Sequence, residues 1–246
     1  MAWCFALAGV FIAATSARLS SAVGDDAHAG SSAVERADLA DQREDEAARP
    51  TFVCNQVTAM TLTREWFEAG FEQTPGIVDA RWQLKAREHG YITEWANPTS
   101  DFWNQAIDSP CANGSASPDH VVLTVLSWVP PCCTTEAQWE AQVAGAVTTL
   151  KAKYTGLVRI DLMTVIRGPG NQACPAPPAP GETVSMPAPL DAALVAVAAK
   201  FPNLVFVAPK FEAPGCAAFR SGGPHLTRAG NAEVAKMIGA HFMHLQ

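Results

Sequence analysis

From Thr51 onward, short apolar runs alternate with segments that carry the 3.6-residue spacing of amphipathic helices. The runs expected to form strands are 51–55, 77–84, 91–95, 120–128, 157–166 and 204–208. The segments expected to form helices are 61–70, 99–108, 134–154, 189–201 and the stretch that follows His225. Strands separated by helices build a mostly parallel sheet. We therefore expect a three-layer α/β/α protein around a mostly parallel sheet of about five strands.

In such a sheet, ligand sites lie beyond the carboxyl ends of the strands. Three segments are expected to meet there. Asn55 and Gln56 follow the first run, Ser127 and Trp128 end the central run, and His225 follows the last run. This fold logic alone makes His225 a candidate site residue.

The first residues have the pattern of a secretory signal. In residues 1–17, an apolar run is followed by small residues that suit a cleavage site. A signal anchor is the alternative, since no Lys or Arg precedes the apolar run. Residues 18–50 are rich in Ala, Asp and Glu and contain no aromatic residue, which predicts a disordered acidic linker. We expect a secreted or extracytoplasmic domain over 51–246, with no membrane span after signal cleavage.

Charge and spacing exclude several classes of partner. The formal net charge is −7 and the sequence has no cluster of Lys and Arg, which argues against a nucleic-acid partner. No C-x-x-C or H-x-x-x-H spacing supports a metal site. We therefore expect neither a metal nor another cofactor. The sequence leaves the oligomeric state open.

The cysteines point to disulfides. The chain has seven, and loss of Cys4 with the signal peptide leaves an even number, which in an exported chain indicates disulfide bonds. The candidates are Cys54, Cys111, Cys132, Cys133, Cys174 and Cys216. Sequence alone does not choose among their pairings. A thiolate at Cys54 paired with His225 is possible chemistry, but a disulfide, for instance to Cys111, is favoured.

The stretch GPHLTRAGNAEVAKMI, residues 223–238, resembles the closing motif of the SGNH (GDSL) hydrolases. In that superfamily a D-x-x-H turn opens the terminal helix, and its histidine is the general base. The resemblance covers roughly residues 51–246. It implies a flavodoxin-like, SGNH-type fold and acyl transfer from an ester to water, with His225 as the base.

The other motifs of that superfamily are altered. Aligned on the first strand, Cys54-Asn55-Gln56 replaces G-D-S, so that Gln56 stands in the place of the nucleophilic serine. The central run ends LTVLSWVP, without the asparagine that donates to the oxyanion. Gly222 replaces the aspartate that orients the histidine. A carboxamide is not a nucleophile, and thus Ser127 is the best replacement, ahead of Thr58 and Ser100.

These observations leave three hypotheses. The first is an exported SGNH-like ester hydrolase of the esterase, lipase or acetyl-esterase type, with His225 as base and Ser127 as attacker. In it Asn55 or Gln56 would donate to the oxyanion. The second is a catalytically inactive SGNH-fold module that binds a glycan or acyl ligand through Gln56, Trp128 and His225, since aromatic walls suit such ligands. The third is a disulfide-linked α/β domain unrelated to hydrolases.

Overall fold

The computed structural model describes residues 51–245, apart from residues 89, 109, 114–116, 126–132, 173, 175–187 and 222 and the side chain of Ala59. The expected signal peptide (1–17) and acidic linker (18–50) lie outside the described residues and stay predictions, and so does the domain boundary near Thr51. Among the described residues, no helix combines the length and the hydrophobicity that a membrane crossing requires.

The described domain is built on a five-stranded sheet in which every neighbouring pair is parallel. The strands are β1 (Asn55–Met60), β2 (Trp82–Arg87), β3 (His120–Val125), β4 (Arg159–Thr164) and β5 (Val205–Val207). Their order across the sheet is β2-β1-β3-β4-β5, with β3 at the centre and buried along its whole length. The expected fold class is therefore confirmed.

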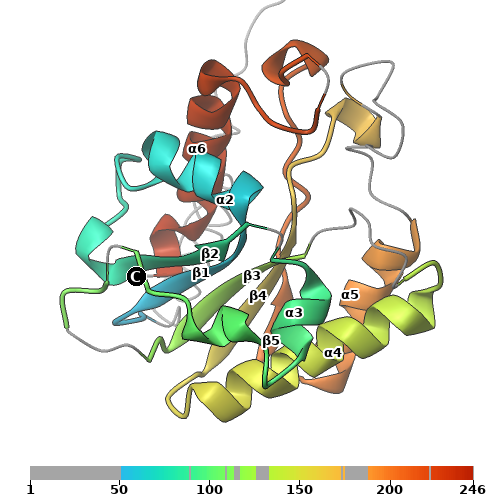
Figure 1. The fold of residues 1–246 in the computed structure, drawn as a ribbon. Helices are drawn as coiled ribbons and strands as arrows, with labels where there is room; N and C mark the ends of the chain where they lie inside the picture. The colour runs from blue at the N-terminus through green and yellow to red at the C-terminus, as the bar shows by residue number, and fades with distance from the viewer. Residues whose placement is uncertain are drawn as a thin grey trace, which may run out of the picture. The chain divides into compact units, whose positions relative to one another are not determined.

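Helices cover both faces of the sheet (Figure 1). On one face lie α6 (Arg228–Phe242) and α2 (Thr61–Trp66), which continues as a wider turn over Phe67–Phe71. On the other face lie α3 (Ile92–Ala96), α4 (Glu136–Lys153) and α5 (Ala188–Lys200). Short 3₁₀ turns occupy Asp79–Arg81, Asp101–Asn104, Pro169–Asn171, Cys216–Ala218 and Met243–Leu245. Each face of the sheet thus has its own apolar core.

Three strand predictions were wrong in place or type, and one of them is 77–84, where Asp79–Arg81 forms a 3₁₀ turn and the strand β2 begins only at Trp82. The segment 91–95 was expected to be a strand but forms α3, because Ile92 and Trp95 are one helical turn apart and both pack into the core under α4. Short apolar runs do not distinguish a strand from a buried helical turn. The first strand begins at Asn55, where the sequence predicted its end.

Four of the six candidate cysteines form two disulfides between described residues. Cys54 is bonded to Cys111, with Cα atoms 5.7 Å apart, and Cys174 to Cys216, with Cα atoms 5.1 Å apart. Cys133 is also disulfide-bonded, and Cys132 lies outside the described residues. The bond to Cys216 ties the loop after β4 to the loop between β5 and α6.

Helix α4 begins with the expected capping box. The Thr135 hydroxyl accepts from the Gln138 amide at 3.3 Å, and the Gln138 side chain accepts from the Thr135 amide at 3.2 Å. We expect Thr135→Ala to lower the free energy of unfolding by about 1 kcal/mol, because an amide of the first turn loses its acceptor. Thr148→Ala, at an exposed site in the same helix, is the control and should change stability little. Urea denaturation of both variants measures the difference, and equal stabilities would contradict the capping role.

Candidate functional site

The candidate site lies where β1 ends and α6 begins. In a parallel sheet the carboxyl ends of the strands are the usual ligand edge, and β1 ends at Met60, directly before α2. The loop that leads into α6 brings His225 against α2, where its Nδ1 lies 2.9 Å from Oε1 of Glu65. The His225 side chain is 37% exposed and the Glu65 side chain 20% exposed. The imidazole is therefore open to a ligand while its Nδ1 is held by a carboxylate.

The loop around His225 is fixed by its own hydrogen bonds. The Arg220 amide donates to the His225 carbonyl at 2.7 Å, and Arg220 Nε donates to the Leu226 carbonyl at 2.8 Å. The Thr227 hydroxyl accepts from the Gly230 amide and caps α6. A Cβ on Gly230 would lie 2.5 Å from the carbonyl oxygen of Ala218. Glycine at this position therefore lets α6 begin close enough to the loop to place the histidine.

Helix α2 presents polar atoms at this edge that have no hydrogen-bond partner within the described part of the chain. Oγ1 of Thr61, Oγ1 of Thr63 and Oε2 of Glu65 are shielded from solvent and have no hydrogen-bond partner within the described residues. Thr61 and Glu65 are four residues apart in the helix, so they share a face with Cβ atoms about 5–6 Å apart. The Thr61 hydroxyl thus lies one helical turn from the carboxylate that contacts His225. Buried polar atoms without partners are rare, and those in a native structure call for an explanation.

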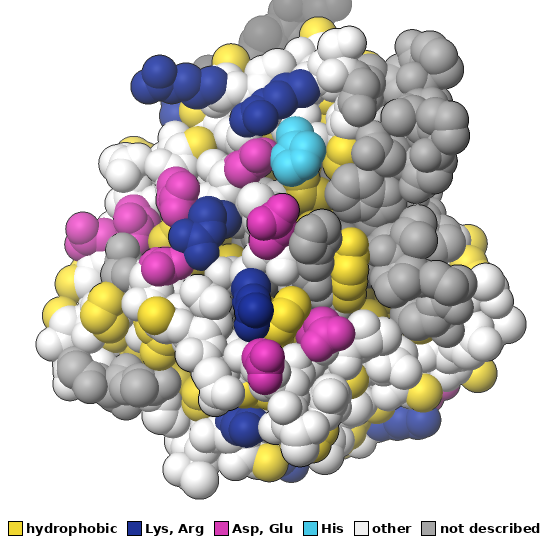
Figure 2. Space-filling model, viewed as in Figure 1, with side chains coloured by type: hydrophobic (Ala, Val, Ile, Leu, Met, Phe, Trp, Pro, Cys, Tyr) yellow, Lys and Arg dark blue, Asp and Glu magenta, His cyan; other side chains and the backbone are white. Residues whose placement is uncertain are grey.

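Charges of both signs surround this edge. Figure 2 shows a histidine on the face in view, with basic side chains above it and acidic side chains beside and below it. An Arg220 guanidinium nitrogen lies 3.7 Å from the same Glu65 oxygen that contacts His225. On the other side of α2, Arg64 pairs with Glu68 at 3.3 Å and with Asp108 at 2.7 Å. The His225–Glu65 pair is therefore part of a mixed charged surface.

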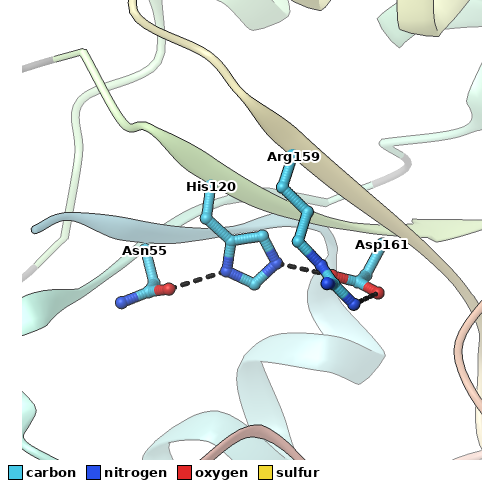
Figure 3. Close-up of polar contacts among 4 residues, drawn as sticks. All are labelled: Asn55, His120, Arg159 and Asp161. Atoms are coloured by element: carbon cyan, nitrogen blue, oxygen red, sulfur yellow. Dashed lines mark hydrogen bonds and ion pairs between the residues drawn. The ribbon is translucent and has the colours of Figure 1, made fainter. Parts of the chain in front are cut away.

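Asn55 and Gln56, which the sequence placed at the ligand edge, lie at the opposite end of the sheet. Both belong to the start of β1 and are fully buried. Oδ1 of Asn55 lies 2.6 Å from Nδ1 of His120, whose Nε2 lies 2.8 Å from Asp161 (Figure 3). Arg159 holds the same carboxylate through two hydrogen bonds, at 2.6 and 3.0 Å. The expected roles of Asn55 and Gln56 in ligand and oxyanion binding are therefore wrong on position.

The four residues in Figure 3 form a polar cluster around the buried His120. The ring of Phe52 stacks on His120 with centroids 4.8 Å apart, and Phe242 at the end of α6 lies 6.1 Å from it. Burial lowers the pKa of His120, an effect that the hydrogen bond to Asp161 opposes. Burial resists ionisation of Asp161, but hydrogen bonds from His120 and Arg159 outweigh it and lower the pKa of that carboxyl. The cluster is thus a carboxylate that pairs with Arg159 and contacts His120 in the interior.

Gln56 belongs to a second buried network, on the other face of the sheet. Its amide nitrogen donates to the Thr58 hydroxyl at 2.7 Å and to the Tyr154 hydroxyl at 3.1 Å, and its oxygen accepts from Gln83 at 2.9 Å. Burial is the main reason that the pKa of Tyr154 is raised. These side chains have their polar atoms turned toward one another. Their role is to join β1 and β2 to the end of α4.

Four other candidate residues were predicted for the site: Ser127, Trp128, Thr58 and Ser100. Ser127 and Trp128 lie outside the described residues, so their roles stay predictions. Thr58 is held in the buried network at β1, and the hydroxyl of Ser100 donates to Glu94 at 2.8 Å while it caps a short turn. Both hydroxyls are engaged in hydrogen bonds within the fold. Among the described residues, no group of three or more metal-binding side chains converges.

Sequence reasoning missed Thr61 and Glu65. The available signal was their four-residue spacing in a segment that was correctly expected to be helical. This signal was missed because the first strand was predicted to end at Asn55. Thr61 becomes the first residue after the strand only when the strand runs to Met60.

No protein-family model matches the chain, and no curated protein matches it in sequence. Among solved structures, a family two carbohydrate esterase from Clostridium thermocellum, determined in complex with cellohexaose, is similar, with a TM-score of 0.46 and 11% sequence identity. The likeness covers 79% of this chain, which spans 64% of the length of that esterase chain.

Proposed function

We propose that the chain is an ester hydrolase in which Thr61 is the nucleophile and His225 the general base. The observation that carries the proposal is the hydrogen bond from His225 to α2, one turn beyond a Thr61 hydroxyl that has no hydrogen-bond partner among the described residues. A hydroxyl becomes a nucleophile when a neighbouring base removes its proton, and a base oriented by a third group is the usual arrangement. Thr61 replaces Ser127 as our preferred attacker.

The corrected position of β1 also supports Thr61. With the strand running to Met60, the residues that follow its end are Thr61, Leu62 and Thr63. Ala59-Met60-Thr61 then takes the place of G-D-S, where the earlier alignment had put Cys54-Asn55-Gln56. The resembling family carries a serine hydroxyl at this point, and this chain carries a threonine hydroxyl.

The proposed reaction follows the usual course of acyl transfer. Oγ1 of Thr61 attacks the carbonyl carbon of the ester while its proton passes to Nε2 of His225. The C–O bond to the alcohol breaks, and the alcohol leaves with that proton. Water then attacks the acyl-threonine, again losing a proton to His225, and the carboxylic acid is released as Thr61 regains its proton. No oxidant, reductant or metal is needed in this sequence.

The proposal extends to the class of substrate and to the cellular compartment. The solvent-facing imidazole suits a substrate that reaches the edge of the sheet, for which we propose an acylated small molecule or sugar. The disulfides support an oxidising compartment outside the cytoplasm. Export by the signal sequence at 1–17 belongs to the same proposal.

A fluorophosphonate probe tests the proposal directly. The full-length chain with its disulfides intact is treated with the probe, and the adduct is located by mass spectrometry. We expect the label on Thr61, its loss in Thr61→Ala and its retention in Thr61→Ser, which keeps a hydroxyl. Ser127→Ala is the matched control and should be labelled like the wild type.

Two outcomes would overturn the assignment. A label on Ser127 that persists in Thr61→Ala would move the nucleophile to the central strand. Absence of any label, together with no hydrolysis of p-nitrophenyl acetate, would favour a module that binds a glycan or acyl ligand without turning it over.

A further inference from the structure

We infer that Glu65 is the positioning residue of His225, supplied by α2 in place of a carboxylate on the histidine's own loop. The inference rests on the proposed function, since it assigns a role to the neighbour of the proposed base. Gly222 stands three residues before His225, where the resembling family has its orienting aspartate, and glycine has no side chain for that role. The carboxylate in contact with the ring is instead 160 residues away in the sequence.

The geometry fixes which ring nitrogen carries the proton. A carboxylate only accepts hydrogen bonds, so the Nδ1 that lies 2.9 Å from Glu65 must donate. In the neutral ring this leaves Nε2 without a proton and free to accept one, as a general base requires. Without the carboxylate, both tautomers are open to the ring, and only one of them has its basic nitrogen at Nε2.

The environment of Glu65 separates this role from that of an ordinary surface ion pair. Arg220 lies 3.7 Å from the oxygen that contacts His225, yet the second oxygen, Oε2, is shielded from solvent and has no partner in the described residues. A buried acceptor without a partner calls for an explanation, and a role in a ligand site supplies one. Partly exposed ion pairs contribute little to stability, and loss of this one should therefore leave the fold intact.

The tautomer of His225 is the first readout. Long-range ¹H–¹⁵N correlation spectra of the full-length, ¹⁵N-labelled chain are recorded at about pH 8, where the free imidazole is neutral. His225→Asn identifies the resonance. We expect the Nδ1–H form in the wild type. We expect a shift toward the Nε2–H form in Glu65→Gln, because a carboxamide can donate its own N–H to Nδ1.

The second readout is the hydrolysis of p-nitrophenyl acetate. Glu65→Gln should lower kcat by about tenfold or more while KM changes little, because the base and not the substrate contact is affected. Glu65→Asp keeps a carboxylate and should restore part of the rate. Glu68→Gln, an exposed carboxylate three residues along, is the matched control and should behave like the wild type.

The outcomes separate the two proposals. An unchanged tautomer together with an unchanged kcat in Glu65→Gln would overturn the role of Glu65 and leave the proposed function standing. An inactive wild type whose His225 is Nδ1–H, and loses that form in Glu65→Gln, would overturn the hydrolase and support the positioning. A wild-type ring in the Nε2–H form would contradict the positioning whatever the activity.

Discussion

Replacing His225 with alanine is expected to lower kcat/KM for p-nitrophenyl acetate by about 10²–10⁴-fold, the usual contribution of a general base. The Thr61 hydroxyl has no other imidazole at the same edge among the described residues, so its proton has no comparable acceptor. The side chain is 37% exposed, and its loss should leave the unfolding transition close to that of the wild type. Initial rates and a urea melt of the same preparation measure both effects.

The control for this substitution is His244→Ala. His244 is exposed near the end of the chain and follows α6, so its loss should change neither rate nor stability. A His225→Ala variant that hydrolyses the ester at the wild-type rate would remove the histidine from the mechanism. Equal losses in both variants would indicate a general effect on α6 and not the loss of a base.

Asp161→Ala is expected to lower the free energy of unfolding by about 3–5 kcal/mol, the cost of breaking a buried pair by removing one partner. The Asp161 side chain is 2% exposed and receives hydrogen bonds from both His120 and Arg159. Its removal leaves the His120 ring with an unmet donor and Arg159 without its counterion. Urea denaturation followed by tryptophan fluorescence measures the loss, and Asp101→Ala, at an exposed site, is the control.

The pH dependence of that stabilisation has a definite sign. The pKa of Asp161 is lowered in the folded protein, so the carboxylate is favoured by folding. Its contribution is fully present above the unfolded value of about 3.9 and is lost as the pH falls through the lower folded value. The stability gap between the wild type and Asp161→Asn should therefore narrow below about pH 4. A gap that stays constant to pH 3 would contradict an ionised, stabilising Asp161.

Much of the fold was predictable because local patterns agreed with the tertiary structure. The run HVVLTV is buried on both faces, as a central parallel strand must be. The capping pair Thr135 and Gln138 predicts the start of α4. Helix α3 was missed because the two apolar side chains that define it suit a strand equally well. The expectation that β1 would end at Asn55 failed because Gln56 and Thr58 are polar residues on a buried face, which a hydrophobic pattern does not reveal.

The polar cluster around His120 shows why the polar contacts of the interior could not be predicted. His120 carried no signal of its own, since the partner carboxylate is 41 residues away on the next strand. The one available sign was the charged pair Arg159 and Asp161, spaced two apart on one face of an otherwise apolar strand. Parallel pairing of β3 with β4 brings these groups together. The sequence alone does not state that register.

An alternating α/β chain with a histidine directly before its last helix could be predicted from the residues, because apolar periodicity and helix caps are local properties. Which end of β1 lies near that histidine depends on the packing of the whole domain and is not contained in any local pattern. The first strand runs five residues further than its apolar start suggested, which moves Asn55 into the interior and leaves Thr61 at the edge. The packing of the domain also brings Glu65 into contact with His225. Such a contact depends on how α2 packs against the loop before α6, and a local sequence pattern does not predict it.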